Sequence, residues 1–214
     1  MTAQPERASD SYFSAKMLDG IERTILIVAY VYLVYRVADA AYASGSWYSI
    51  MVAMSELFVL IFILIRRPTD KISINASDWV IAVGATTLPL TIEFSELYPL
   101  VTPILCVLVV IIGIFIQLYA KLSLRRSFGL VPANRGIKVE GPYRVIRHPM
   151  YAGYFLTHVG LFLIYPSLWN LAVYVSAAFL QIIRILREEN LLITDQIYQN
   201  YKKNVQSRLI PGIF

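Results

Sequence analysis

Six long apolar stretches, joined by short polar connections, restrict what this chain can fold into. They span approximately Ile21–Ser44, Trp47–Ile65, Ala76–Ile92, Leu100–Leu122, Met150–Tyr165 and Leu168–Leu186. A helix needs about 20 apolar residues to cross the ~30 Å hydrocarbon core of a bilayer, and only the third and fifth stretches lie near the lower limit. Hydrophobic residues make up 57% of the chain and charged residues only 15%, which is not the balance of a soluble domain. The sequence therefore predicts an all-α, polytopic integral membrane protein with about six transmembrane helices.

The distribution of lysine and arginine predicts how these helices are oriented. Of the 19 basic residues, all but Arg36 lie near the two ends of the chain or in the connections after the second and fourth stretches. Short loops rich in lysine and arginine stay in the cytoplasm, so we expect both termini to be cytoplasmic. The membrane would be the inner or plasma membrane in a bacterium and the endoplasmic reticulum in a eukaryote. The net charge of +5 then reflects topology and attraction to anionic lipids, and we expect no nucleic-acid partner.

Two polar clusters flank the hairpin formed by the last two apolar stretches. The first runs from Gly141 to Gly153, and the second is Arg187-Glu188-Glu189. If both stretches cross the bilayer, the two clusters end at the same membrane face. Cations, a histidine and paired carboxylates would then meet at one depth, an arrangement for which an inert membrane anchor has little use.

The first cluster has the composition of an anion-binding site. Pro149 suits the first position of a helix, whose free N–H groups would lie beside Arg144 and Arg147. Glu188 and Glu189 lie toward the carboxyl end of the next helix, where the dipole disfavours negative charge, so they require cations nearby. A purely structural ion-pair network is also consistent with these charges.

The rest of the chain divides into a scaffold and a module. Residues 1–122 are expected to form an amino-terminal scaffold of about four spans, in which Arg36, Asp39 and Glu56 are predicted to form a structural network. Residues 123–214 would hold a glycine- and proline-containing cytoplasmic loop, two spans and a short tail helix on the membrane. The single Cys106 lies within a span, so neither a disulfide nor a metal site is expected.

The module resembles the isoprenylcysteine carboxyl methyltransferase family, within a wider group that includes phospholipid methyltransferases. The resemblance covers about 40% of the chain and rests on ordered motifs. They are Arg126-Ser127-Phe128-Gly129, Pro132-Ala133-x-Arg135-Gly136, Gly141-Pro142-Tyr143-Arg144, Arg147-His148-Pro149-Met150-Tyr151-Ala152-Gly153, Glu188-Glu189-x-x-Leu192, Tyr198-x-x-Tyr201 and Arg208-Leu209-Ile210-Pro211.

This resemblance implies methyl transfer from S-adenosyl-L-methionine to a lipophilic or lipid-anchored acceptor at the cytoplasmic face. It assigns to the cofactor the residues Tyr143, His148, Pro149, Tyr151, Gly153 and Glu189. It assigns to catalysis or the acceptor the residues Arg144, Arg147 and Glu188. Because no reserved general base is evident, we expect an anionic acceptor group, a carboxylate or thiolate, as in a prenylcysteine or related lipid. A fatty or polyketide-derived lipid, a quinone precursor and a phospholipid amine are the alternative acceptors, and an alcohol or amine would need Glu188, Glu189 or His148 as its base.

Two other functions fit parts of the pattern. Membrane sterol reductases, which use NADPH, share a similar Arg-His-Pro-x-Tyr sequence, although the consecutive Glu188-Glu189 and the short chain argue against them. A small transporter or assembly factor would use the charged clusters only as a structural lock.

Overall fold

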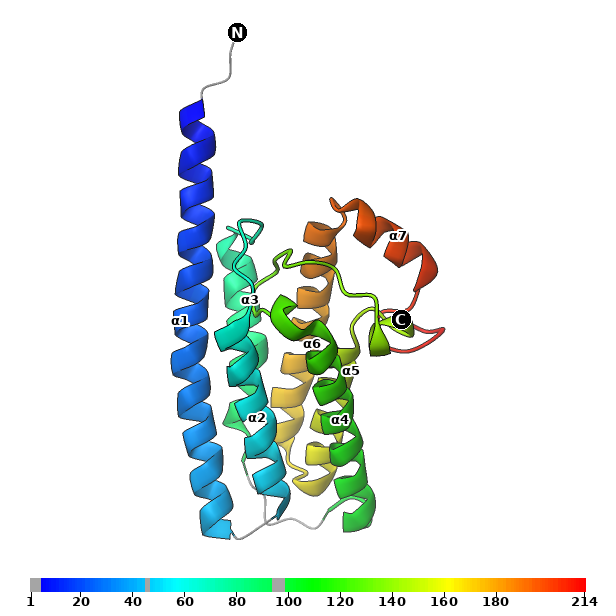
Figure 1. The fold of residues 1–214 in the computed structure, drawn as a ribbon. Coiled ribbons are helices and arrows are strands. Elements are labelled where there is room, and N and C mark those ends of the chain that lie inside the picture. The colour runs from blue at the N-terminus through cyan, green and yellow to red at the C-terminus, as the bar shows by residue number, and fades with distance from the viewer. Residues whose placement is uncertain (1–4, 45–46, 94–98) are drawn as a thin grey trace. The chain divides into compact units, whose positions relative to one another are not determined.

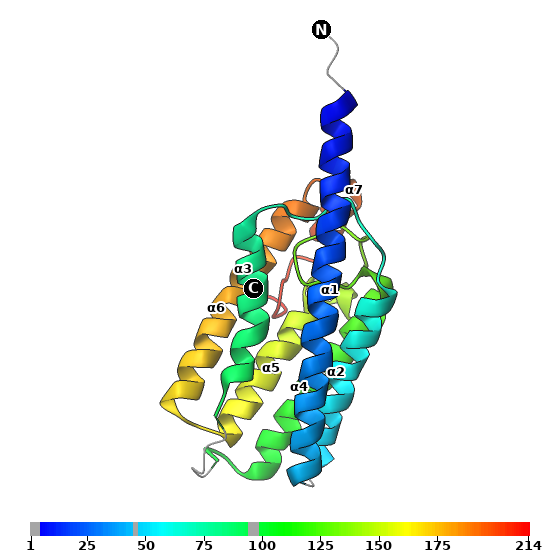
Figure 2. The same cartoon turned by 90° about the vertical axis from the view of Figure 1, so that its left-hand side faces the viewer.

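The computed structural model describes residues 5–44, 47–93 and 99–214, with some side chains of α1 and α2 left out (Figures 1 and 2). Its helices are α1 (Pro5–Ser44), α2 (Trp47–Ile65), α3 (Ala76–Thr87), α4 (Pro103–Leu124), α5 (Pro149–Ile164), α6 (Leu168–Leu192) and α7 (Gln196–Asn204). Short 3-10 turns are η1 (Leu88–Thr91), η2 (Arg125–Ser127) and η3 (Gly141–Arg144). The described residues form no β-strand, only one bridge between Ile72 and Ala133, which confirms the all-α prediction.

The apolar stretches predicted which segments form helices, but several helix ends differ. α1 begins at Pro5, far before the predicted Ile21, so it includes most of the polar amino-terminal segment. The third stretch leaves α-helical geometry at Thr87 and continues as η1, because Pro89 removes a backbone donor. The sixth continues to Leu192, beyond the predicted Leu186 and through both glutamates. The tail helix α7 therefore starts only at Gln196, where the Asp195 carboxylate caps it by accepting from the Ile197 N–H at 2.8 Å.

The chain forms two compact units, each built from two separate stretches of sequence. Unit 1 comprises residues 1–75 and 125–137, and unit 2 comprises residues 76–124 and 138–214. In unit 1, α1 and α2 pack side by side in opposite directions (Figure 1). Leu26, Val59 and Ile63 are buried between them and give the pair an apolar core.

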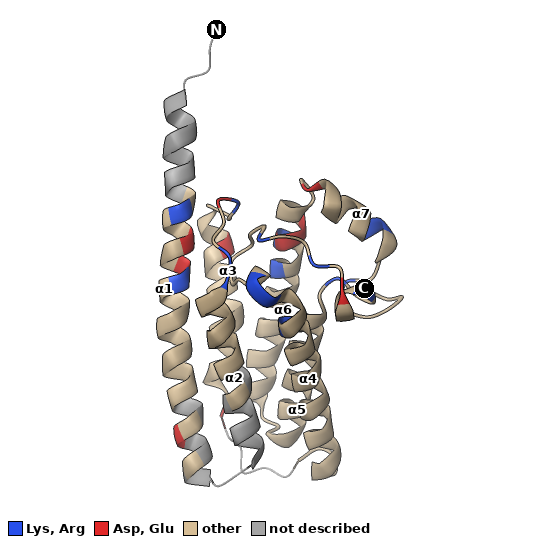
Figure 3. Ribbon diagram, in the orientation of Figure 1, with Lys and Arg blue, Asp and Glu red and all other residues tan. Residues whose placement is uncertain are grey.

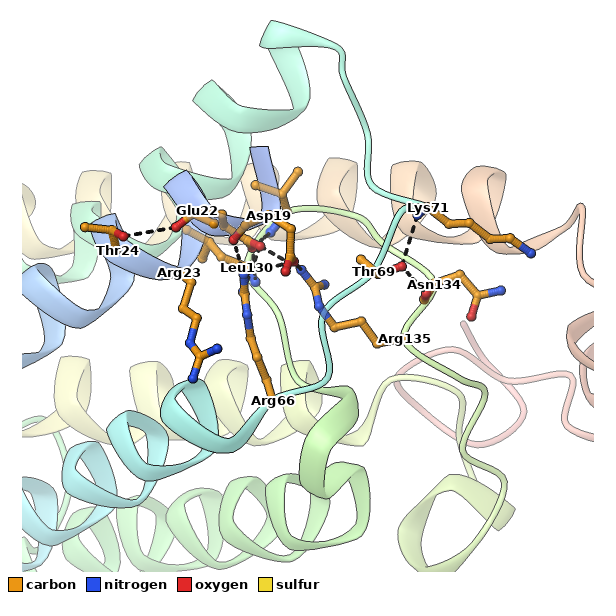
Figure 4. A network of polar contacts seen from close by, with 12 residues as sticks. Asp19, Glu22, Arg23, Thr24, Arg66, Thr69, Lys71, Leu130, Asn134 and Arg135 are labelled. Carbon is orange, nitrogen blue, oxygen red and sulfur yellow. Dashed lines mark hydrogen bonds and ion pairs between the residues drawn. The ribbon is translucent and has the colours of Figure 1, made fainter. Parts of the chain in front are cut away.

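A buried ionic network fastens the 125–137 segment within unit 1 (Figure 4). Glu22 on α1 receives Arg66 and Arg135, each at 2.7 Å, and its other oxygen accepts the Leu130 and Val131 N–H groups at 2.8 Å. Asp19, one turn earlier, pairs with the same two arginines at 3.0 and 2.6 Å. The two carboxylates thereby balance the two guanidiniums. Of the predicted Arg36–Asp39–Glu56 network, the side chains of Arg36 and Glu56 lie outside the described ones, and Asp39 is exposed.

Unit 2 is built on close contact between α4 and α5. A Cβ at Gly113 would lie 2.6 Å from the Thr157 nitrogen, and one at Gly160 would lie 2.8 Å from the Val110 nitrogen. Only glycine therefore allows the two backbones to come this close, which is how helices pack in membranes. On the other side of unit 2, α6 packs mainly on α3, where Gln181 donates to the Ala85 carbonyl at 3.4 Å. α5 and α6 touch one another less extensively than either of these pairs.

Two helical segments of the described residues, Pro103–Ser127 and Leu168–Leu192, are long and apolar enough to cross a membrane. Each exposes an apolar stripe. On α4 it comprises Ile104, Leu108, Ile112, Phe115 and Tyr119, and on α6 Leu168, Leu171, Val175, Phe179, Ile182 and Leu186. In Figure 3 the charged residues of α4 and α6 lie toward their α7 ends, whereas Glu93 lies at the opposite end, where its backbone pairs with Asn170 near the start of α6.

Candidate active site

The amino-terminal end of α5 is fixed by a proline and by the chain's carboxy-terminal segment. Pro149 occupies the first turn of the helix, as predicted, and His148 precedes it with φ −128°. The backbone N–H groups of Arg147 and His148 do not remain free, because they donate to the Ser207 and Arg208 carbonyls at 2.9 Å each. The tail thus covers part of the helix end, and the first turn offers a ligand the N–H groups of Met150 and Tyr151.

Tail helix α7 holds the preceding turn η3 in place. The Tyr201 hydroxyl donates to the Tyr143 carbonyl at 2.6 Å, and the Arg147 guanidinium donates to the Val205 carbonyl at 3.2 Å. Burial raises the pKa of the Tyr143 phenol well above its usual range, and the nearby Glu188 charge raises it further. Burial likewise raises the pKa of Tyr201. Both phenols are therefore neutral hydrogen-bonding groups.

Glu189 is the centre of a cluster of cations. Its Oε1 lies 2.9 Å from Arg147 Nε and 3.2 Å from His148 Nε2, while Oε2 lies 3.2 Å from Arg208 Nε and 4.0 Å from Lys202 Nζ. The Glu189, Arg147 and His148 side chains are 4%, 3% and 5% exposed. Even with a neutral imidazole, three permanent cations surround one carboxylate. The cluster carries surplus positive charge.

Glu188 has different surroundings, although it is the neighbouring residue. Its carboxylate accepts from the Tyr151 hydroxyl at 2.9 Å, and within the described part of the chain it forms no ion pair. The Tyr151 ring lies 5.6 Å from the His148 ring and is covered by the Arg184 guanidinium at 5.2 Å. A carboxylate held by a neutral phenol therefore lies next to the cationic cluster.

The remaining predicted site residues, Arg144, Pro149 and Gly153, lie in different surroundings. Arg144 is exposed, whereas Pro149 is fully buried at the start of α5. Gly153 faces α4, since a Cβ there would lie 2.6 Å from Gln117 Cγ and 2.8 Å from the Gly113 carbonyl oxygen. Close packing gives a sufficient reason for this glycine, and the predicted cofactor contact of Gly153 stays a prediction. The structure thus brings together Arg147, His148, Tyr151, Glu188 and Glu189.

Sequence reasoning did not single out two buried polar residues beside this cluster. Gln117 and Lys121 lie one turn apart on α4, and Lys121 is fully buried. The Gln117 amide donates to the Gly153 carbonyl at 3.3 Å and to Thr157 Oγ1 at 2.7 Å. Two polar residues at positions i and i+4 of an otherwise apolar stretch lie on one helix face, and this pattern could have indicated a buried polar pair. Lys121 stands near the end of the fourth apolar stretch, so its position in the sequence alone does not separate it from the cations of the following loop.

The charges of the site fit a zwitterionic ligand that carries one additional positive charge. Arg147, His148 and Arg208 offer more cationic groups than Glu189 neutralises, so a ligand carboxylate is favourable there. The Glu188 carboxylate beside this cluster favours an ammonium or sulfonium. S-adenosyl-L-methionine has these groups. In the described part of the chain, no three His, Cys, Asp or Glu residues group as metal ligands.

Comparison with known proteins shows what the part of the chain that carries this site is similar to. A family model described as phospholipid methyltransferase matches residues 101–201, which include α4, α5, α6 and most of α7. A search of curated proteins found no match. The matched region contains Arg147, His148, Tyr151 and both glutamates, and it overlaps the region in which the motifs resembled membrane methyltransferases. Residues 101–201, a little under half of this chain, are therefore similar to the phospholipid methyltransferase family of membrane methyltransferases.

Proposed function

We propose that the protein transfers a methyl group from S-adenosyl-L-methionine to an anionic group, a carboxylate or thiolate, of a lipophilic acceptor. A prenylcysteine or a related lipid has the required chemistry. The observation that carries the proposal is the contrast between Glu189, which is surrounded by cations, and Glu188, whose carboxylate accepts a hydrogen bond from the Tyr151 phenol. Two adjacent carboxylates with such unequal surroundings provide one site for an anion and one for a cation.

The chain's own residues would bind and orient the reactants. The cofactor supplies a methyl group made electrophilic by its sulfonium. Arg147, His148 and Arg208 would hold the cofactor carboxylate, and Glu188 with Tyr151 would hold a positively charged cofactor group. Arg147 and Glu188, which the sequence assigned to catalysis or the acceptor, thereby move to the cofactor side, and Glu189 becomes the residue that positions the cations. An acceptor that is already anionic needs positioning and exclusion of water more than a general base.

A six-span topology with cytoplasmic termini fits this function. The apolar stripes of α4 and α6 and the placement of the basic residues support it. It is testable by cysteine labelling, because the native Cys106 is buried. A membrane-impermeant maleimide should label Leu168→Cys in intact cells and Asp70→Cys only after permeabilisation. The opposite pattern would refute the orientation.

The proposed chemistry is tested by binding and by methyl transfer. Isothermal titration should show S-adenosylhomocysteine binding to the wild-type protein and no NADPH binding, and Glu188→Gln should weaken the former. Glu140→Gln, an exposed carboxylate at the start of η3, is the matched control. Lipid extracts of cells with and without the protein should differ in a species heavier by one CH₂ unit. NADPH binding without S-adenosylhomocysteine binding would favour a reductase, and binding of neither would favour a structural lock.

A further inference from the structure

Lys121 is a fully buried cation that contacts no anion within the described part of the chain. Its relative exposure is 0%, and its Nζ lies 3.5 Å from the Gln117 amide oxygen and 5.3 Å from the centre of the Tyr154 ring. Among the described residues no carboxylate pairs with it. An ammonium has three N–H donors, and one long hydrogen bond to a neutral amide does not replace its hydration.

The usual structural roles of a lysine at this position do not account for the burial. A lysine at the end of a membrane helix normally extends its ammonium to the aqueous interface, which would leave the side chain exposed. The negative end of the α4 dipole favours a cation in the last turn, but that effect is smaller than the cost of dehydrating an ammonium. A cation kept in such a place is best explained by an anion that enters with a ligand.

The neighbours of Lys121 hold it beside the candidate active site. Both amide hydrogen bonds of Gln117 go to α5, so its oxygen is left facing the ammonium. Tyr154, whose ring the ammonium covers, lies one turn from Tyr151, and their ring centres are 6.4 Å apart. Tyr151 in turn donates to Glu188. An unbroken line of aromatic and polar contacts therefore runs from Lys121 to the place proposed for the cofactor's positive charge.

We propose that Lys121 binds an anionic oxygen of the methyl acceptor, from a carboxylate or a phosphodiester. This inference rests on the proposed function and adds a residue that recognises the acceptor, distinct from the residues that would hold the cofactor. Both anion sources suit a point charge such as an ammonium. The apolar surroundings of α4 and α5 would receive the acceptor's hydrocarbon chain.

Binding to the full-length protein in detergent micelles tests the proposal. The probes are a prenylcysteine with a free carboxylate, its methyl ester, a short-chain phosphatidylethanolamine and S-adenosylhomocysteine. Lys121→Met removes the charge and keeps the length of the side chain, so the packing of α4 on α5 is retained. Lys203→Met, at an exposed lysine of α7, is the control. We expect Lys121→Met to weaken binding of one anionic probe about tenfold or more, and to leave S-adenosylhomocysteine binding unchanged.

The outcomes separate this inference from the proposed function. A Lys121-dependent loss for the prenylcysteine, with weak binding of its methyl ester to wild type, supports a carboxylate, and the same loss for the phosphatidylethanolamine supports a phosphodiester. If neither anionic probe binds wild type more tightly than Lys121→Met, the inference is wrong even when S-adenosylhomocysteine binds. If Lys121-dependent binding is found but S-adenosylhomocysteine does not bind, the anion site stands and the methyltransferase proposal fails.

Discussion

Replacing each of the adjacent glutamates by glutamine should have very different effects on stability. Glu189→Gln removes the only negative charge among Arg147, His148, Arg208 and Lys202, whereas the amide retains the shape of the side chain. Glu188→Gln keeps an oxygen that still accepts from the Tyr151 hydroxyl. The two variants change the same chemical group one residue apart, so each is the other's control.

The size of the difference follows from burial. Breaking a buried ion pair by removing one partner costs about 3–5 kcal/mol, because the remaining charge is left uncompensated. Arg147 and His148 are such buried partners, whereas Arg208 and Lys202, at 27% and 38% exposure, add only about 0.2–1 kcal/mol. The amide oxygen recovers part of the loss. We therefore expect Glu189→Gln to lower the free energy of unfolding by about 3 kcal/mol and Glu188→Gln by less than about 1 kcal/mol.

Reversible unfolding by dodecyl sulfate in mixed micelles, followed by tyrosine fluorescence, measures both values. A double-mutant cycle that combines Glu189→Gln with Arg147→Gln isolates the Arg147–Glu189 interaction. Its coupling energy should lie between about 0.5 and 3 kcal/mol. Equal losses for the two glutamate variants would refute the reasoning, because they would show that the cations around Glu189 are solvated or paired elsewhere.

Three further predictions concern other parts of the molecule. Glu22→Ala should destabilise unit 1 by about 3–5 kcal/mol and increase protease cleavage within residues 125–137, with Glu22→Gln less affected. Gly153→Ala should cost about 1–3 kcal/mol because its methyl group overlaps α4, whereas Gly20→Ala, which has no atom within 4 Å of the new Cβ, should be neutral or stabilising in a dodecyl sulfate titration. Burial raises the pKa of Tyr143 and Tyr201. The stability that the two neutral phenols contribute is therefore complete below pH ~10 and falls as the pH rises further. In a pH titration, tyrosinate absorbance should appear at higher pH in the folded than in the unfolded protein.

The sequence by itself determined the helices and the composition of the site. Apolar runs long enough for a bilayer predict helices whatever their partners, and Pro149 sets the start of α5 because it lacks a backbone donor. The motif residues His148 and Glu189 could be nominated from their order in the chain. Such patterns are local, and they describe one helix at a time.

Tertiary structure decided which of these residues face one another. Two neighbouring glutamates on one helix point in different directions, so only the fold gives Glu189 its cations and Glu188 its phenol. Arg144 and Arg147 are close in sequence, yet Arg144 is exposed and Arg147 is buried under the tail. The burial of Lys121 depends on the close contact of α4 with α5. Glycines on both helices at the contact points permit that contact. Periodicity carries no information on which helix a face will contact, because that choice depends on packing between segments far apart in the chain.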